Sequence, residues 1–507
     1  MAPAPDRRRP RVHPLTLVAL LVACGAPPAP TGADPDPNAT AAAPESTQAS
    51  DAPAGTLGVY IVVDQLPMGL FRAAQPQFRG GLARLTGPDS YTGVARHAHA
   101  ATYTCPGHAT LSTGASPAVH GIVGNGWIAD GKAQYCGDIE LLLADTLADR
   151  VVAQGGRVAS LSHKDRGAIM MAGRSAAASV WWDKKKGGFR GTPWAERLDW
   201  RSTASQWVPR SPDALAAHAA DAQAHEGHSL DRTTFPYPPQ DDPRKFLYTP
   251  SAGQAMVDLA DLAVANLDLG GGARRDLLTI SFSHTDYVGH NFGPDSWEAV
   301  DALVRLDEQL GELFTALDER LEGRWFAVLS SDHGAPPAGN IRRLDEDAMI
   351  ATAKAALQAA GHASQITYAD PTFYLAEDTA DRQAAAVVLA DAVGTIEGLS
   401  AVAWKTGAQA PASVSDAVHA DRSGEVFVLP DEGWVFAHKK APTTGTQHGT
   451  PHDYDAQVPL LAVGAGVNPG RAAAELDTRQ IAPTVAALLG VPEPTDAQLE
   501  GVAEVIR

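Results

Sequence analysis

The sequence is poor in cysteine and in cationic residues. Only three cysteines occur among 507 residues, so no large cysteine set competes for a metal site. Lysine and arginine total 40 against 59 aspartates and glutamates, which gives a formal net charge of -19. A protein that tracks the nucleic-acid backbone needs clustered cations, so we expect no binding to a nucleic-acid polymer. Small anionic substrates stay compatible with this charge, because metal ions and a few cations can reverse the field inside one cleft.

The apolar run near the N-terminus is too short to span a bilayer. It covers residues 15–23 and follows four arginines between positions 7 and 11, the arrangement of an export signal. The run ends in Leu-Val-Ala-Cys24, which resembles the lipobox of bacterial lipoproteins, where the cysteine is lipidated after cleavage. Residues 1–24 therefore read as a lipoprotein-type signal peptide that anchors the protein through Cys24 to a bacterial membrane, in the periplasm or at the cell surface. Ordinary secretory cleavage is the alternative, and both interpretations predict an exported protein.

Lipidation of Cys24 would leave Cys105 and Cys136 as a pair in an oxidising compartment. A disulfide between them is one prediction, and two reduced buried thiols are the other. The sequence leaves both open, because it does not show whether the two Cβ atoms approach each other.

Beyond the signal, the chain divides into a tether and a long globular part. Residues 25–55 hold Pro, Ala, Ser, Thr and Asp with almost no large apolar side chain, which predicts a disordered tether. From 56 to 507, apolar runs of strand length alternate with helix-like stretches such as 296–321. This alternation predicts an α/β domain with a mostly parallel central sheet. The apolar runs are 57–64, 158–162, 277–283, 325–331 and 458–463.

Two regions fit the alternation less well. Residues 170–245 are rich in Trp, Pro, Lys and Asp, and residues 345–440 combine an Ala-rich helix with short strand-like pieces. We interpret both as insertions or cap segments around the sheet, where substrate preference would be set.

Acidic residues and histidines follow several of the apolar runs. The carboxyl ends of parallel strands are where ligands collect in such sheets. Carboxylates and imidazoles suit a borderline divalent metal, and this set is large enough for two metal sites. Two metals can clamp the attacking and leaving oxygens of a displacement at phosphorus. The candidates are Asp64, Asp286, His290, Asp332, His333 and His448, with His452 as an alternative to the last.

Thr104 is the candidate nucleophile. It lies in Thr-Tyr-Thr104-Cys-Pro-Gly-His, where Pro and Gly mark the start of a predicted helix. A threonine hydroxyl needs a base or a metal to attack at neutral pH, and zinc would serve. A helix start also directs backbone N–H groups toward an anion. The simpler interpretation of Thr104 taken alone is a helix cap.

Several motifs together resemble the alkaline-phosphatase superfamily. They are Val-Val-Asp64-Gln, Thr104-x-Pro-Gly-His-Ala, Gly-Ile-Val-Gly-Asn125, Lys164-Asp-Arg166-Gly-Ala, Asp286-x-x-x-His290, Ser-Asp332-His333-Gly and His448-Gly. Within the superfamily they are most similar to single-chain bacterial alkaline phosphatases of the PafA type, relatives of the type I phosphodiesterases and nucleotide pyrophosphatases. The resemblance implies an alkaline-phosphatase-like fold, with helices on both faces of the sheet and cap insertions.

The resemblance also implies the cofactors and the roles of the site residues. Two Zn²⁺ ions are expected, and Thr104 would attack phosphorus to form a phosphothreonine that water then hydrolyses. An arginine suits the binding of phosphoryl oxygens through its bidentate fork. One zinc would be held by Asp286, His290 and His448, the other by Asp64, Asp332, His333 and the Thr104 oxygen, and the non-bridging oxygens would be bound by Asn125, Lys164 and Arg166.

The Lys164-Asp-Arg166 element favours phosphate monoesters as substrates. A monoester dianion presents an extra charged oxygen, whereas diesterase relatives generally lack this pair of cations. The close alternative is a phosphodiesterase or nucleotide pyrophosphatase with the same two-metal site. A less favoured alternative is an inactive lipoprotein that binds small phosphorylated ligands. The sequence does not give the oligomeric state.

Overall fold

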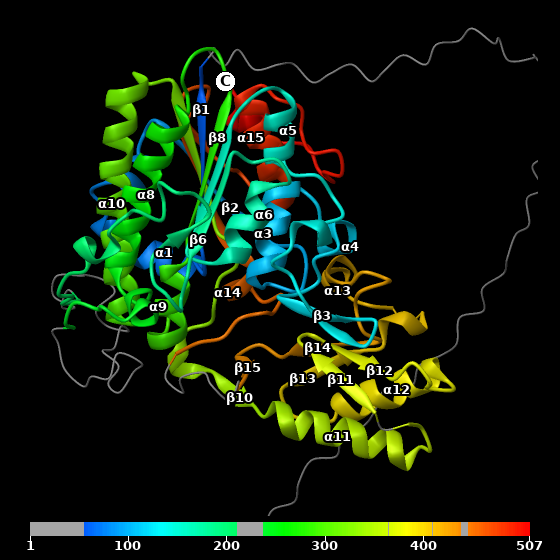
Figure 1. The fold of residues 1–507 in the computed structure, drawn as a ribbon. Coiled ribbons are helices and arrows are strands. Elements are labelled where there is room, and N and C mark those ends of the chain that lie inside the picture. The colour runs from blue at the N-terminus through cyan, green and yellow to red at the C-terminus, as the bar shows by residue number, and fades with distance from the viewer. Residues whose placement is uncertain (1–54, 210–236, 364, 408, 438–444) are drawn as a thin grey trace, which may run out of the picture. The chain divides into compact units, whose positions relative to one another are not determined.

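Five parallel strands form the middle of the central sheet (Figure 1). Four of them, β1, β5, β8 and β9, are buried along their whole length, the pattern of a strand covered on both faces, whereas residues of β6 alternate between buried and half-buried. In β1 all seven residues are buried, and the strand pairs in parallel with β8 on one side and β9 on the other. Across the sheet these strands are β9 (Trp325–Ser330), β1 (Leu57–Val63), β8 (Asp276–Phe282), β5 (Val158–Ser162) and β6 (Ala178–Trp182).

The two ends of this sheet include antiparallel strands. β16 (Gln457–Gly464) runs antiparallel to β9 and to β2 (Ser90–Arg96), and β7 (Phe189–Arg190) runs antiparallel to β6. Two short strands, β17 (Gly470–Arg471) and β18 (Leu476–Asp477), pair in parallel with β2. The ten-stranded sheet of the described residues is therefore mixed but mostly parallel, which confirms the predicted α/β class.

Helices cover both faces of the sheet (Figure 1). One apolar core lies between the sheet and a helical layer that contains α8 and α10, and a second lies on the opposite face against α5 and α15. The first layer comprises α1 (Met68–Ala74), α2 (Gly81–Leu85), α8 (Pro250–Leu267), α9 (His284–Phe292) and α10 (Trp297–Leu321). The second comprises α3 (Thr104–Thr113), α5 (Leu147–Ala153), α6 (Asp165–Ala172) and α15 (Ile481–Leu489).

A separate four-stranded antiparallel sheet lies within the second predicted insertion. It has its own apolar core, packed against two helices. Its strands, in order, are β11 (Ile366–Ala369), β12 (Thr372–Leu375), β14 (Val426–Pro430) and β13 (Leu399–Val402), and its helices are α11 (Glu346–Ala359) and α12 (Arg382–Val393). In the first predicted insertion, by contrast, β6 and β7 extend the central sheet itself.

The remaining elements are short. β3 (Gly126–Ala129) and β4 (Lys132–Tyr135) form a hairpin, and β10 (Arg342–Leu344) pairs with β15 (Trp434–Phe436). The short helices are α4 (Pro117–His120), α7 (Pro243–Phe246), α13 (Ala412–Ala417) and α14 (Asp453–Ala456).

The computed structural model describes residues 55–209, 237–363, 365–407, 409–437 and 445–507. The predicted signal peptide, Cys24 and residues 25–54 of the predicted tether lie outside these ranges. All described residues belong to one compact unit, Gln48–Arg507. None of the helices in the described ranges combines the length and the apolar character needed to cross a bilayer.

Candidate active site and metal centre

The predicted site residues come together at one edge of the central sheet, where the parallel strands end. Asp64 directly follows β1, Lys164 lies two residues after β5, and Asp332 lies two residues after β9. Asp286 lies in the first turn of α9, which follows β8. His448 arrives from the other direction, because β16 is antiparallel to β9 and the segment before it therefore lies at the same edge.

One group of metal-ligand type consists of Asp286, His290 and His448. Each can present one ligand atom within 4.8 Å of the others. Asp286 and His290 lie four residues apart on α9, and His290 Nε2 is 3.1 Å from Asp286 Oδ1. His448 Nε2 is 3.8 Å from the same oxygen. The three residues that were predicted to share one metal are thus close enough to do so.

The second predicted group, Asp64, Asp332 and His333, lies beside the first. His333 Nε2 is 3.7 Å from Asp64 Oδ1 and 3.5 Å from Asp332 Oδ2. The rings of His333 and His448 stack with centroids 3.6 Å apart, which places the two groups next to each other. All three residues of the second group are fully buried.

His108 also reaches this group, although the sequence did not single it out as a ligand. Its Nδ1 is 3.1 Å from Asp332 Oδ2 and 2.8 Å from the Thr104 carbonyl oxygen. Its Nε2 is 2.9 Å from Ser281 Oγ. Because both ring nitrogens have protein partners, His108 is suited to orienting Asp332 and the start of α3 rather than to coordinating a metal.

The three candidate histidine ligands share one arrangement of hydrogen bonds. In each ring Nδ1 lies within hydrogen-bond distance of a backbone carbonyl: His290 at 2.9 Å from Thr446 O, His333 at 3.0 Å from Gly334 O, and His448 at 2.8 Å from Thr102 O. Donation from Nδ1–H to a carbonyl leaves the Nε2 lone pair for another partner, and metal-binding histidines are commonly held this way. In all three residues Nε2 is the atom that faces the carboxylates.

The buried ligand atoms at this edge have few polar partners. Asp64 Oδ2 meets the Lys164 ammonium at 2.9 Å and Asp332 Oδ2 meets His108 Nδ1 at 3.1 Å, while His333 Nε2 has no hydrogen-bond partner and faces carboxylate oxygens. Buried polar atoms are nearly always paired in proteins, and a bare imidazole nitrogen that faces buried carboxylates makes a donor set that a divalent cation would complete. The donors therefore fit a pair of divalent metals, and the chain holds a candidate two-metal site. Its donor chemistry does not identify the metal.

Electrostatics at the site support the same conclusion. Burial and the nearby charge of Asp332 together raise the pKa of Asp64 to about 7. Burial, with the neighbouring His333 and His290, lowers the pKa of His448 well below its usual value and keeps the ring neutral. A metal ligand must be an anionic carboxylate or a neutral imidazole, so a bound cation would favour the protonation states that the ligands need.

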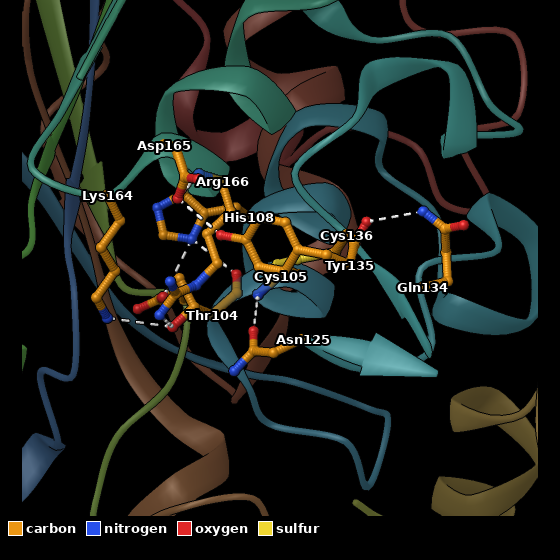
Figure 2. Close-up of a disulfide and its surroundings, with 11 residues drawn as sticks. Thr104, Cys105, His108, Asn125, Gln134, Tyr135, Cys136, Lys164, Asp165 and Arg166 are labelled. Atoms are coloured by element: carbon orange, nitrogen blue, oxygen red, sulfur yellow. Dashed lines mark hydrogen bonds and ion pairs between the residues drawn. A yellow bond between two sulfur atoms is a disulfide. The ribbon is translucent and has the colours of Figure 1, made fainter. Parts of the chain in front are cut away.

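Thr104 is the first residue of α3, and Figure 2 shows its side chain facing Lys164 and Arg166. It is 1% exposed. Its Oγ1 accepts from Lys164 Nζ at 3.2 Å and from Arg166 Nη2 at 3.5 Å. The hydroxyl thus has two cations beside it, as an atom that attacks a phosphoryl group requires.

Lys164 also contacts two of the candidate ligands. Its Nζ is 2.9 Å from Asp64 Oδ2 and 2.7 Å from Asp286 Oδ2, and its side chain is 1% exposed. One ammonium group therefore faces two buried carboxylates, with Asp332 close behind. With metals bound to those carboxylates, the ammonium would be free to turn its charge toward a substrate at Thr104.

Asn125 is held beside the nucleophile by its side-chain oxygen (Figure 2). Asn125 Oδ1 accepts from the Cys105 N–H at 3.0 Å, so this N–H at the start of α3 is not available to an anion. The Asn125 NH₂ group remains as a donor. Cys105 forms a disulfide with Cys136, which decides between the two alternatives that the sequence left open. The bridge links the start of α3 to the end of the β3–β4 hairpin, which Asn125 directly precedes.

Two positioning residues were missed by sequence reasoning. Gln65 donates from Nε2 to Asp286 Oδ1 at 3.1 Å and from its backbone N–H to Asp332 Oδ1 at 3.2 Å. It does so with a φ of 61°, unusual for a residue other than glycine. Asp455 accepts from the N–H groups of Gly449 and Thr450 and so holds the loop that carries His448. Only the position of Gln65 directly after Asp64 could have drawn attention to it.

His452 does not join either cluster. Its Nε2 is 3.0 Å from the Pro430 carbonyl oxygen, next to the four-stranded sheet. Of the two histidines offered for this position, His448 is therefore the one at the candidate metal centre.

The chain resembles known proteins over most of its length. The sequence pattern of the type I phosphodiesterase / nucleotide pyrophosphatase family matches residues 59–455. Alkaline phosphatase PhoV of Synechococcus elongatus is 28% identical over 89% of this chain and 93% of its own. Alkaline phosphatase PafA of Elizabethkingia meningoseptica is 27% identical over 90% of this chain and 95% of its own. A crystal structure of PafA superposes with a TM-score of 0.81 at 24% identity, covering 90% of this chain and 99% of that one, which shows a common fold.

Proposed function

Because the chain belongs to the type I phosphodiesterase / nucleotide pyrophosphatase family, we propose that it hydrolyses phosphate monoesters to inorganic phosphate, with two zinc ions and a phosphothreonine intermediate. The observation that carries the proposal is the position of Thr104. Its hydroxyl lies within 3.5 Å of both Lys164 and Arg166, beside two groups of metal-ligand side chains. The relatives named alkaline phosphatases, which match nearly the full length, support the same reaction.

The proposed ligand sets follow the two clusters. Asp286, His290 and His448 would hold one zinc, and Asp64, Asp332 and His333 would hold the other together with the Thr104 oxygen. Zinc in these positions supplies Lewis acidity and positive charge at the reacting oxygens.

In the first step the Thr104 hydroxyl gives up its proton to solvent and its Oγ1 forms the new bond to phosphorus. The bond from phosphorus to the leaving-group oxygen breaks, and that oxygen takes up a proton from solvent. In the second step the oxygen of a water molecule attacks the phosphothreonine, and Thr104 Oγ leaves to restore the enzyme. Arg166 and Lys164 lie where they would stabilise the negative charge on the phosphoryl oxygens in both steps. The Asn125 side chain is held by the hydrogen bond that its oxygen accepts from the Cys105 N–H, and its NH₂ group would donate to a third phosphoryl oxygen.

The presence of two cations at the nucleophile favours a monoester over a diester. A monoester dianion carries one more charged oxygen than a diester, and Arg166 and Lys164 both lie within reach of the phosphoryl position at Thr104. The family description keeps the phosphodiesterase as the alternative function.

A comparison of two substrates tests this proposal. The zinc-loaded protein is assayed on p-nitrophenyl phosphate and on bis-p-nitrophenyl phosphate, for the wild type and for Arg166→Ala. We expect a strong monoester preference in the wild type, and a loss of about 10²-fold or more in kcat/KM on the monoester alone in the variant. Arg72→Ala, at an exposed position on α1, is the control. A wild type that prefers the diester would replace this function with the phosphodiesterase.

We also propose that the protein is exported and anchored by lipid at Cys24, so that it acts on small phosphorylated compounds outside the cytoplasm. The cationic and apolar N-terminal segment that ends at Cys24 supports this proposal. Fractionation of cells that express the wild type or Cys24→Ala tests it. We expect the wild type in the membrane fraction and the variant released from it, and an identical distribution of the two would contradict the anchor.

A further inference from the structure

A turn between β6 and β7 places three consecutive lysines near the candidate active site. Lys184, Lys185 and Lys186 are all exposed. The Asp183 carboxylate accepts from the N–H groups of Lys185 at 2.8 Å and Lys186 at 2.9 Å, and it also pairs with Arg190. These hydrogen bonds hold the backbone of the turn and so fix the direction in which each lysine side chain leaves it.

Lys184 differs from its two neighbours because it packs on an aromatic ring of the site. Its Nζ lies 4.7 Å from the centre of the Tyr287 ring. The Nζ of Lys164, which contacts Thr104, lies 5.6 Å from the centre of the same ring. Tyr287 follows the candidate ligand Asp286 and is itself 9% exposed. Lys184 is thus a third cation beside the Lys164 and Arg166 pair.

The charges around Lys184 make its position costly without a ligand. Among the described residues no carboxylate lies within ion-pair distance of its Nζ, and its one aromatic contact is with Tyr287. Loss of hydration, then the charges of Arg166 and Lys164, lower the pKa of Lys184 to about 8. The charges of Asp286 and Asp165 oppose this lowering of the pKa without cancelling it, and a cation held among other cations in this way favours the binding of an anion.

The anion that Lys184 would meet is not the transferred phosphoryl group. That group must lie against Thr104 Oγ1, where Lys164 and Arg166 already donate. Lys184 makes no hydrogen bond to Thr104 and remains exposed, so it faces the part of the substrate that points toward solvent. In an in-line displacement the leaving group departs on the side of phosphorus opposite the attacking oxygen, and because Thr104 is buried we take that side as the one toward solvent.

We propose that Lys184 forms a subsite for an anionic leaving group, so that the enzyme prefers phosphoryl compounds whose leaving group carries a second negative charge, such as a phosphate or a carboxylate. This inference rests on the proposed phosphatase function and adds a substrate class to it. Tyr287 serves as the platform that holds the ammonium group in place.

Two related substrates test the subsite: phenyl phosphate and 4-carboxyphenyl phosphate, whose leaving group carries an added carboxylate. The comparison between protein variants cancels the difference in leaving-group pKa between the two substrates. They are compared in the wild type, in Lys184→Gln, which removes the charge at similar length, and in Lys184→Arg, which keeps it. Lys185→Gln, in the same turn but without the contact to Tyr287, is the control. For each protein kcat and KM are measured at low and high salt.

We expect Lys184→Gln to lower kcat/KM about fivefold on 4-carboxyphenyl phosphate, mainly through KM, and to leave phenyl phosphate within about twofold. Lys184→Arg should retain the preference for the charged substrate, and salt should weaken it in the wild type. An equal loss on both substrates, or no change on either, would overturn the subsite while the phosphatase function stands. Absence of turnover on both substrates in the wild type would overturn the proposed function, and the subsite with it.

Discussion

The carboxyl edge of the central sheet and the four-stranded sheet differ in how their buried carboxylates are paired. In the small sheet, Glu425 is 7% exposed, and its two oxygens accept from the Leu375 N–H and from Arg382. At the edge of the large sheet, Asp64, Asp286 and Asp332 are buried side by side, and one ammonium group, that of Lys164, contacts both Asp64 and Asp286. The apolar cores of the two regions are otherwise of the same kind.

This difference distinguishes a buried carboxylate that stabilises the fold from a group of carboxylates placed to bind a ligand. A buried carboxylate whose oxygens are both paired contributes to folding, because breaking the pair leaves its partners unsatisfied. A group of neighbouring buried carboxylates repels itself and weakens the fold, and it persists only where a ligand compensates its charge. Removing groups from each region should therefore affect different observables.

The largest expected effect is on turnover, at the nucleophile. Thr104→Ala removes the attacking oxygen, so we expect kcat on a phosphate monoester to fall by at least about 10³-fold. The thermal unfolding midpoint should change little. Thr104→Ser keeps a hydroxyl and should lose far less activity, and an active alanine variant would exclude Thr104 as the nucleophile.

Removal of metal should affect both turnover and stability. Treatment with a chelator should abolish activity, and added Zn²⁺ should restore it. Calorimetry should show the zinc-loaded protein to be more stable, by about 3 kcal/mol at a hundredfold excess of free metal over its Kd. If chelation leaves both the activity and the unfolding curve unchanged, the candidate ligands at the sheet edge do not bind a metal.

The disulfide supports the site without belonging to it, because it links the start of α3 to the β3–β4 hairpin. Cys105 and Cys136 are 31 residues apart in the sequence. Replacing both with alanine should lower the free energy of unfolding by about 2–4 kcal/mol. KM for a monoester should rise as well, since Asn125 would be less firmly placed. Denaturant unfolding and steady-state kinetics measure the two effects, and unchanged stability would contradict a structural bridge.

The smallest effect is expected from the paired charge of the small sheet. Glu425→Ala leaves the Leu375 N–H and Arg382 without their partner, so we expect a loss of about 2 kcal/mol in unfolding free energy. Activity per folded molecule should stay the same, because Glu425 is not part of the site. Glu377→Ala, an exposed position after β12, is the control and should change neither quantity.

The strands and the local order of the site residues were predictable from the sequence. Continuous apolar runs of strand length became β1, β5, β8, β9 and β16, and residues 296–321 became α10 capped by Ser296. The spacing of Asp286 and His290 on one helical face follows from the period of the helix. These features depend on local patterning, which short stretches of sequence carry.

The mutual placement of the site residues was not predictable from the residues themselves. Apolar periodicity does not give strand direction, so it did not show that β16 is antiparallel and brings His448 to the same edge as Asp332. The sequence suggested no role for Gln65 or Lys184, because their contacts to Asp286 and Tyr287 join segments far apart in the chain. Resemblance to a family supplied the grouping of ligands that residue patterns alone did not supply.

The sequence by itself determined which segments would be strands and helices, and which side chains could bind a metal or attack phosphorus, because burial patterns and side-chain chemistry are local properties. Only the tertiary structure decided that Cys105 would meet Cys136 and that Lys164 would lie between Asp64 and Asp286. It also decided that Lys184 and Lys164 would both contact the ring of Tyr287. These contacts depend on the register and direction of strands distant in the chain, which packing of the whole core sets.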